Sequence, residues 1–297
     1  MAKKGTYYLG RVIKLGTLDQ AMLMHAMLNP SPYKSRGNAW TIIDCKRYRS
    51  GQQDFIFGRL SKYVPEGEVT VIDEEKRQER QQREPNLQVA SSPFIYVPSH
   101  SGIAFLNVYG HIEQKTFMAI FAGIIEETYR GFFVECHIEL VSDLKSFAAK
   151  LNALEKIFQI RAKVFPPNPL FGPLWEPLKE YLISRNTGTM SITEDAPDCQ
   201  SIDTDIQNIV QQAADQIEEN AYFTNERIPI GDAAILMAAD GYGIGAVRGI
   251  YEDEIIVVKT SETAKNFSFD KNPAPHELYE KVLSILIEIE KNRHMQH

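Results

Sequence analysis

The sequence predicts an α+β fold of mixed or antiparallel sheets flanked by helices, arranged in two lobes. Runs of strand-like segments are interrupted by single helical segments, without the regular strand–helix alternation of a parallel sheet. The composition, 43% hydrophobic and 24% charged, is that of an ordinary globular protein. A chain of 297 residues suits one large domain or two smaller ones.

The first third of the chain predicts strands around one helix. Residues 6–14 alternate as a strand, and residues 18–28 place apolar side chains at helical spacing before Asn29 and Pro30 end the helix. Three more strands follow, at 40–45, 54–63 and 68–73, with loops at 30–37, 49–53 and 65–67. Residues 73–85 mix both charges without a hydrophobic side chain after Asp73, which predicts a solvated helix or a mobile linker.

The middle of the chain alternates strands with single helices. Strands at 93–97 and 103–109 are joined by a tight turn, and a helix at 112–129 ends before Gly131. A strand at 132–141 precedes Ser142, which is expected to cap a helix at 143–154. The next strand, 156–165, stops at a proline-rich break.

The last third predicts a second set of strands and a final helix. A helix at 174–184, a strand at 189–192, an acidic loop at 194–205 and a helix at 206–219 come first. An antiparallel meander is expected from segments 233–239, 244–250 and 254–260, with the glycines of 240–245 as a hairpin turn. The helix at 276–292 is apolar on most faces, so it should pack on something. We expect one domain from 1–154 plus 273–297, and another from 155–272.

Charge is distributed unevenly along the chain. Residues 1–63 hold 11 Lys and Arg against 3 Asp and Glu, so this part carries +8 while the whole chain carries −7. The remainder therefore carries −15. Such an asymmetry points to a polyanion as the partner of the basic part.

Bases and aromatic side chains alternate within this basic part, as a groove for nucleic acid requires. We therefore predict phosphate contacts and base stacking from two neighbouring strands, through Lys46, Arg47, Tyr48, Arg49, Arg59, Lys62 and Tyr63. The alternative is that these bases face water while the aromatic side chains fill the core.

Two weaker patterns carry other chemistry. Glu135, His137 and Glu139 alternate along one strand, so their side chains share a face and could bind a metal or do acid–base work, although a solvent-facing polar edge explains them better. Asp44 followed by Glu74 and Lys76 resembles a metal-dependent nuclease pattern, which needs the two carboxylates on adjacent strands.

Location and redox state follow from what the chain contains. No apolar run reaches the ~18 residues of a membrane span, and the start lacks the apolar stretch of a signal peptide. We expect a cytoplasmic protein. Cys45, Cys136 and Cys199 lie far apart, which favours buried thiols over disulfides or zinc ligands.

The layout of the first 165 residues resembles the RexA exclusion proteins of phages. The similar segments are a Tyr-rich opening strand at 6–8, an early helix at 18–28, a strand at 54–57 before a charged stretch, a strand pair at 92–105, and a strand ending at 161–165. The resemblance implies a cytoplasmic DNA-binding sensor that self-associates and triggers a partner protein. It implies no catalytic residues.

The expected function is therefore a nucleic-acid-binding sensor or effector of phage defence or phage exclusion, most simply on DNA. We expect no catalytic activity, no cofactor and no metal site, together with homo-oligomers and a partner protein of the same system. Two alternatives stay open: a metal-dependent nuclease, and an interaction module that self-associates through the apolar helix at 276–292.

Overall fold

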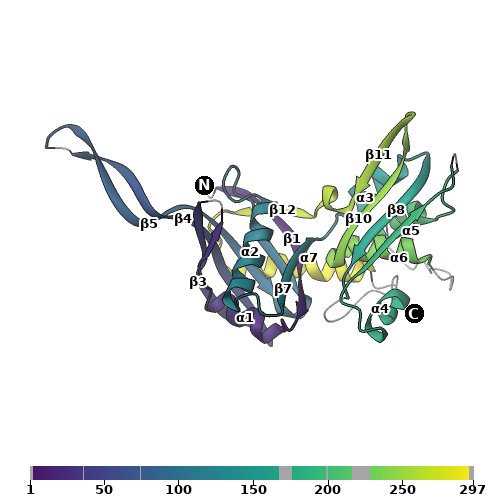
Figure 1. Ribbon diagram of the computed structural model, residues 1–297, viewed down its shortest axis with the longest axis horizontal. Helices are drawn as coiled ribbons and strands as arrows, with labels where there is room; N and C mark the ends of the chain where they lie inside the picture. The colour runs from purple at the N-terminus through teal and green to yellow at the C-terminus, as the bar shows by residue number, and fades with distance from the viewer. Residues whose placement is uncertain are drawn as a thin grey trace.

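The computed structural model describes residues 3–35, 37–73, 75–166, 176–198, 200–215 and 228–293. Its described part folds as two antiparallel sheets flanked by helices, which confirms the predicted α+β class. The larger sheet and its long hairpin occupy one end of the molecule, and the smaller sheet occupies the other (Figure 1).

The large sheet has eight strands in the order β12-β1-β6-β5-β4-β3-β2, with β7 also paired to β1. Strand β1 is shared by three neighbours, because β12 and β7 follow one another along one edge while β6 pairs on the other. The bounds of its strands are β1 (Lys4–Gly16), β2 (Tyr33–Ser35), β3 (Asn38–Ser50), β4 (Gln53–Asp73), β5 (Gln78–Val97), β6 (Gly102–Leu106), β7 (Val134–Leu140) and β12 (Asn266–Asp270).

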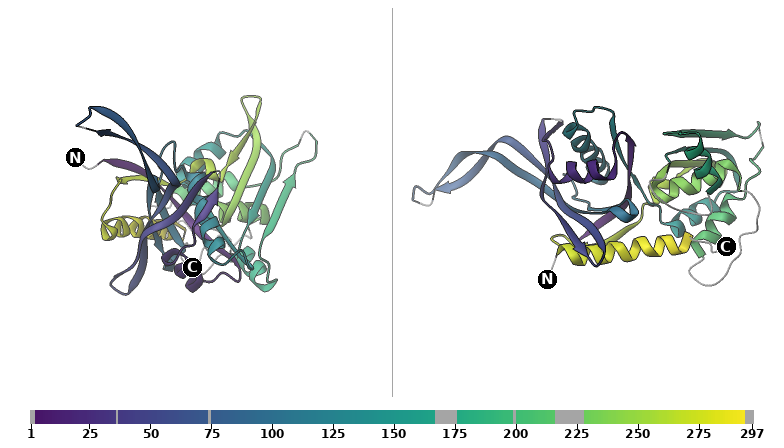
Figure 2. Two further views of the ribbon diagram at one scale, coloured as in Figure 1. Left: turned by 60° about the vertical axis from the view of Figure 1, so that its left-hand side comes forward. Right: turned by 90° about the horizontal axis from the view of Figure 1, so that it is seen from below.

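Helices cover both faces of the large sheet. On one face, α1 (Gln20–Leu28) and α2 (Gln114–Thr128) bury aromatic side chains such as Phe117, which stacks on Phe105 with ring centroids 4.0 Å apart. On the other face lies α7 (Pro275–Arg293), whose Leu278, Val282 and Leu286 are completely buried. This helix runs beneath the large sheet towards the smaller one (Figure 2), where it contacts α5.

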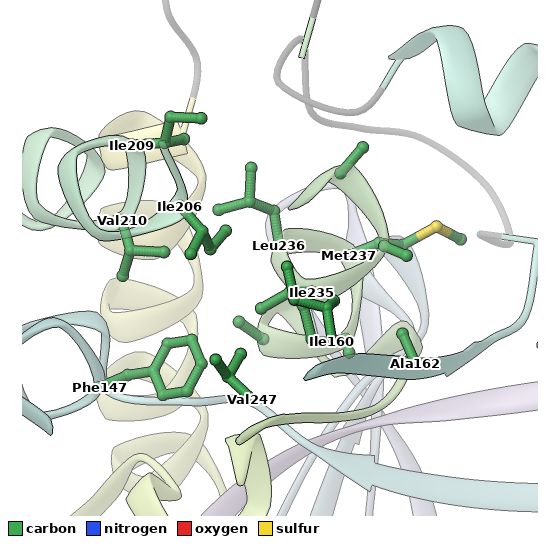
Figure 3. Packing of buried hydrophobic residues seen from close by; sticks show 14 of the residues in the cluster. Phe147, Ile160, Ala162, Ile206, Ile209, Val210, Ile235, Leu236, Met237 and Val247 are labelled. Atoms are coloured by element: carbon green, nitrogen blue, oxygen red, sulfur yellow. The ribbon is translucent and has the colours of Figure 1, made fainter. Parts of the chain in front are cut away.

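The small sheet has four strands in the order β11-β10-β8-β9. Its strands are β8 (Lys156–Val164), β9 (Met190–Asp195), β10 (Gly243–Tyr251) and β11 (Glu254–Lys259). One face carries α3 (Leu144–Asn152), α5 (Ile206–Asp215) and α6 (Ile230–Met237), and α4 (Glu176–Ser184) contacts α6. Figure 3 shows how Phe147, Ile160, Ile235 and Val247 meet in this core.

Three short segments complete the described elements: the 3-10 turns Pro98–His100 and Thr260–Thr263, and the π-type segment Ala238–Tyr242. In the last of these, Gly241 has a φ of 83°, a conformation that favours glycine. It lets the chain leave α6 and enter β10.

Several local predictions were wrong, among them the hairpin turn expected at 240–245, where a π-type segment joins α6 to β10. The described residues of 73–85 are neither helix nor linker, because β4 and β5 form one long hairpin that also includes the loop expected at 65–67. Residues 233–239 are helical and not a strand. The prediction failed because α6 is buried on all sides from Gly231 to Met237, and a continuous apolar run does not distinguish a buried helix from a buried strand. The cap of α3 is Asp143, which accepts from the backbone of Ser146, while Ser142 donates to the carbonyl of Thr260.

The expected domain boundaries at 154/155 and 272/273 differ from those of the two lobes. Helix α3 packs in the core of the small sheet, through Phe147 and Leu151. Strand β12 pairs with β1 in the large sheet. Within the described residues, no helix has both the length and the apolar character that crossing a membrane requires.

Candidate nucleic-acid interface

The seven side chains predicted to bind nucleic acid are divided between the two faces of the large sheet. Side chains opposite one another in an antiparallel pair share a face. Lys62 lies opposite Trp40 and Arg47 opposite Ile56, on the face covered by α1 and α2; Arg49 shares this face. The face covered by α7 carries the other four, Lys46, Tyr48, Arg59 and Tyr63.

Several of these side chains already have partners in the fold. Arg47 forms an ion pair with Asp54, and the Lys62 ammonium lies 5.6 Å from the centre of the Trp40 ring. Tyr48 stacks on Phe55 at 5.3 Å and meets the edge of His276 at the start of α7, so its ring is packed rather than open for stacking.

Arg59 donates to the side chain of Asn272 at 3.3 Å. Two further bases of the amino-terminal part, Arg11 and Lys14, are only 3% and 7% exposed. The basic first fifth of the chain therefore does not form one cationic face.

The nuclease pattern also separates in space. Asp44 lies at the bulge of β3, between the pairs Ile43–Arg59 and Lys46–Phe57. Lys76 lies beyond the last pair of the hairpin, Asp73–Gln78, which places it roughly 45 Å away along the strand at ~3.3 Å per residue. Glu74 is outside the described residues. Asp44 and Lys76 therefore cannot share one metal site.

The Glu135, His137 and Glu139 strand faces the small sheet. His137 Nε2 lies 2.6 Å from a Glu135 oxygen, and its ring stacks on Phe165 at 5.3 Å. Burial raises the pKa of Glu139, against the opposing effects of His137 and Lys163. Among the described residues, no three metal-ligating side chains converge. His137 and Glu139 form part of the contact between the lobes, whereas Glu135 is exposed.

A buried lysine–serine pair is a feature that the sequence did not indicate. Lys14 Nζ lies 3.1 Å from Ser101 Oγ, and burial lowers the Lys14 pKa to about 8. Ser101 also has a left-handed backbone with a φ of 45°. A lysine of lowered pKa beside a serine hydroxyl is the chemistry of an activated nucleophile. However, Ser101 is only 1% exposed, so this hydroxyl is out of reach of a substrate.

A broad basic surface lies on the small sheet, on the face opposite its helices. The register places alternate residues of each strand on this open face: Lys156, Gln159, Arg161 and Lys163 of β8; Ser191, Thr193 and Asp195 of β9; Ile244, Ala246, Arg248 and Ile250 of β10; Ile255, Val257 and Lys259 of β11. The intervening side chains, such as Ile160, Ala162 and Val247, enter the core.

Charge on the open face is strongly one-sided. Its five bases, Lys156, Arg161, Lys163, Arg248 and Lys259, face one acid of the same surface, Asp195. Asp195 itself accepts from Gln159. Lys259 pairs at 3.6 Å with Glu262 at the margin. A surface of this sign is notable in a chain with a net charge of −7.

Aromatic and apolar groups lie among these bases. Phe158 is the extra residue of a bulge in β8, and the Arg248 guanidinium lies 5.5 Å from the centre of its ring. Ile244, Ile255 and Val257 are 50%, 59% and 43% exposed, respectively. The open face therefore offers both cations and flat apolar area.

Sequence reasoning missed this face, although β8 contained the signal. In Lys156–Val164, bases alternate with small or apolar residues near the end of the strand, as in a strand with one buried and one solvent face. The flanking strands carry no such signal, since β11 reads Glu-Ile-Ile-Val-Val-Lys.

Comparison of the chain with protein-family models and with curated proteins finds no match. The similarity to RexA proteins therefore stays a prediction from the layout of the sequence. The binding surface is therefore argued from the geometry of the chain alone.

Proposed function

We propose that the protein binds single-stranded nucleic acid on the open face of the small sheet. The observation that carries this proposal is the set of five bases on one solvent-facing sheet surface with one acid among them. Lys and Arg that neutralise phosphates release condensed counterions, which is the main source of affinity for nucleic acids.

The form of the surface favours single strands over duplexes. An open antiparallel sheet presents a broad platform, whereas reading a duplex usually requires a helix or ribbon that enters a groove. Unstacked bases can lie on Phe158, on the planes of Arg161 and Arg248, and on the exposed aliphatic side chains. The phosphates then follow the lysines.

The wider role is proposed from the sequence. A sensor or effector in phage defence, acting with a partner protein, is consistent with a binding surface that carries no catalytic group. Within the described residues, neither the nuclease pattern nor the lysine–serine pair forms an accessible reactive site. We therefore propose binding without catalysis.

Charge removal on the open face tests the proposal. Changing Lys156, Arg161 and Lys163 to Gln should weaken binding of a fluorescent single-stranded oligonucleotide at least tenfold. It should also reduce the salt slope of log K by about 2, because each lost contact to a single strand contributes ~0.7. All three side chains are exposed, so the fold should persist. Anisotropy titrations from low to moderate salt provide both values for DNA and RNA.

The matched control removes three bases from the originally predicted site, by changing Lys46, Arg47 and Arg49 to Gln. This variant should bind as the wild type does. If the control variant loses affinity and the small-sheet variant does not, the interface belongs on the large sheet. Absence of wild-type binding at every salt concentration would overturn the nucleic-acid function itself.

A further inference from the structure

The hairpin of β4 and β5 continues far beyond the body of the large sheet (Figure 1). We call residues 64–87 the ribbon arm. In this arm β4 and β5 pair with each other from Val64–Leu87 to Asp73–Gln78, while β3 pairs with β4 only as far as Tyr63. On the other side, β6 reaches β5 at Phe94. Both outer edges of the arm are thus unpaired in the described structure.

Unlike the rest of the large sheet, the arm has no buried face to stabilise it. Residues 78–83 are all exposed, and Ile72 is 77% exposed. A two-stranded ribbon without a covered face is marginally stable in water, and an open strand edge is a template for pairing with another strand. The arm therefore needs a partner, and its own sequence indicates which one.

The outer strand of the arm is complementary to itself. Residues 78–84 read Gln-Glu-Arg-Gln-Gln-Arg-Glu, bounded by the hairpin turn and by Pro85, which has no N–H to donate. When this strand pairs antiparallel with a second copy about Gln81, Glu79 lies opposite Arg83 of the second copy, and the reverse pair forms by symmetry. Gln81 then lies opposite Gln81 of the second copy.

Neighbouring registers are worse. Because directly opposed side chains share a face, the two-fold axis must pass through a residue of the strand. Centring the pair on Arg80 would set Arg80 opposite Arg80 and Arg77 opposite Arg83, and directly opposed like charges are destabilising. Centring it on Gln82 would bring Pro85 opposite Glu79 and remove a donor from the ladder. The register about Gln81 uses all seven residues between the turn and Pro85.

Contacts within one arm already prepare this arrangement. Arg83 pairs with Glu68 of the neighbouring strand at 3.4 Å, and Gln81 donates to Thr70 at 3.0 Å. Across the dimer, each Arg83 would lie between Glu68 of its own chain and Glu79 of the second copy. The central pair of Gln81 side chains would join the Thr70–Gln81 rows of the two copies.

We propose that two copies of this chain associate through the ribbon arm, with β5 pairing antiparallel to its counterpart about a two-fold axis to give a four-stranded sheet. This site replaces helix α7 as the surface for self-association, since most of the apolar side chains of α7 are packed in the core. Seven residues per strand bury less than a standard interface of ~1,600 Å², so we expect a dimer of roughly micromolar Kd.

Charge reversal provides a decisive test. In Glu79→Arg alone, two arginines face two arginines, and in Arg83→Glu alone, glutamates face glutamates, so each variant should be monomeric. An equimolar mixture restores both opposite-charge pairs in a heterodimer. Sedimentation velocity across a concentration series should therefore show dimers in the wild type and in the mixture, and monomers for each variant alone.

The variants can be interpreted because the arm lies outside all three hydrophobic clusters, one in the small sheet and one on each face of the large sheet. Unchanged thermal unfolding would show that the variants remain folded. Dimers of both single variants with wild-type affinity, or a wild type that stays monomeric at high concentration, would overturn the proposal.

A cysteine pair supplies a second readout. Gln81→Cys should cross-link to its counterpart under mild oxidation, while Thr70→Cys, one strand further from the axis, should not. Equal cross-linking of the two variants, or none of Gln81→Cys, would contradict the register.

Discussion

Asp232 is the most completely buried acid in the described core of the small sheet. Its side chain has 0% exposure in the first turn of α6, and the Thr204 hydroxyl lies 2.7 and 2.8 Å from its two oxygens. Burial raises the Asp232 pKa to about 6, although the Thr204 hydrogen bond opposes the shift. The ionised carboxylate is therefore destabilising at neutral pH.

The sign of the pH effect follows from the raised pKa. The folded state holds the Asp232 proton more tightly than the unfolded chain, so this group makes the protein less stable as pH rises from about 4 to about 6. Asp232→Asn removes this titration. Between pH 4 and pH 7, the variant should gain about 2.5 kcal/mol of unfolding free energy relative to the wild type.

Urea titrations of the two proteins at pH 4 and pH 7 measure this difference. The comparison does not depend on any constant loss caused by the amide, which has one acceptor oxygen where the carboxylate has two. An equal difference at both pH values would show that Asp232 is not destabilising when ionised.

Single residues also mark the limit of what the sequence could predict about the site. The amino-terminal bases were recognised as an excess of charge, but their distribution between two sheet faces depends on the β3–β4 register. The bulge between Ile43 and Lys46 sets that register, and nothing in the local sequence fixes its position. The sequence therefore predicted the excess of positive charge, but not the sheet face on which each base lies.

At the scale of elements, segments with one buried face were predicted well. Strand β7 and helix α2 carry clear periods of two and 3.6, because each has water on one side and core on the other. The ribbon arm has water on both sides and α6 has core on all sides, so neither carries a period. Residues 73–85 of the arm and helix α6 were assigned wrongly for this reason, whereas the strand expected at 68–73 is confirmed.

The cap of α3 gives a prediction at the same scale. The Asp143 carboxylate accepts from the Ser146 backbone at 3.0 Å and pairs with Lys265 at 2.8 Å. Burial alone would raise the Asp143 pKa, but the Lys265 and Ser146 hydrogen bonds outweigh it and hold the pKa below its usual value. Asp143→Ala should lower the unfolding free energy at pH 7 by about 1–2 kcal/mol.

The Asp143 contribution should depend on acidity. Because its folded-state pKa is lowered, the stabilisation is present above the unfolded pKa and disappears as pH falls through the folded value. Denaturation of the variant and the wild type at pH 7 and at pH 3 measures this, and the two proteins should converge at the lower pH. Ser142→Ala is a contrasting variant, since Ser142 lies before the cap and bonds Thr260 instead. A pH-independent loss in Asp143→Ala would contradict the ionic origin.

At the scale of the whole molecule, the two lobes and α7 meet around Arg11. This side chain comes from the large sheet, donates to the carbonyl of His100, and lies 5.7 Å from the ring of Tyr242 of the small-sheet lobe. Glu290 of α7 lies 3.8 Å from Arg11 and 2.6 Å from His100 Nδ1. Arg11 is 3% exposed, so these neighbours, in place of water, stabilise its positive charge.

This arrangement predicts strong coupling between Arg11 and Glu290. Removing one member of a buried ion pair leaves the other charge uncompensated, which costs about 3–5 kcal/mol at full burial. Glu290 retains some exposure, so we expect about 2–3 kcal/mol for Glu290→Ala or Arg11→Met alone. The double variant should lose at least ~1 kcal/mol less than the sum of the two, because it leaves neither charge unpaired.

Chemical denaturation of the four proteins completes the cycle, and the exposed pair Lys150–Glu262 serves as its control. That pair has a similar separation of 3.8 Å but lies in water, so its coupling should not exceed ~0.5 kcal/mol. If the losses of unfolding free energy at Arg11 and Glu290 simply add in the double variant, water already screens the interaction between the two charges. Strong coupling between Arg11 and Glu290 would show that the large sheet and α7 stabilise one another through a buried ion pair. Because this pair lies at the contact with the small-sheet lobe, it would also help to hold the proposed binding face in place.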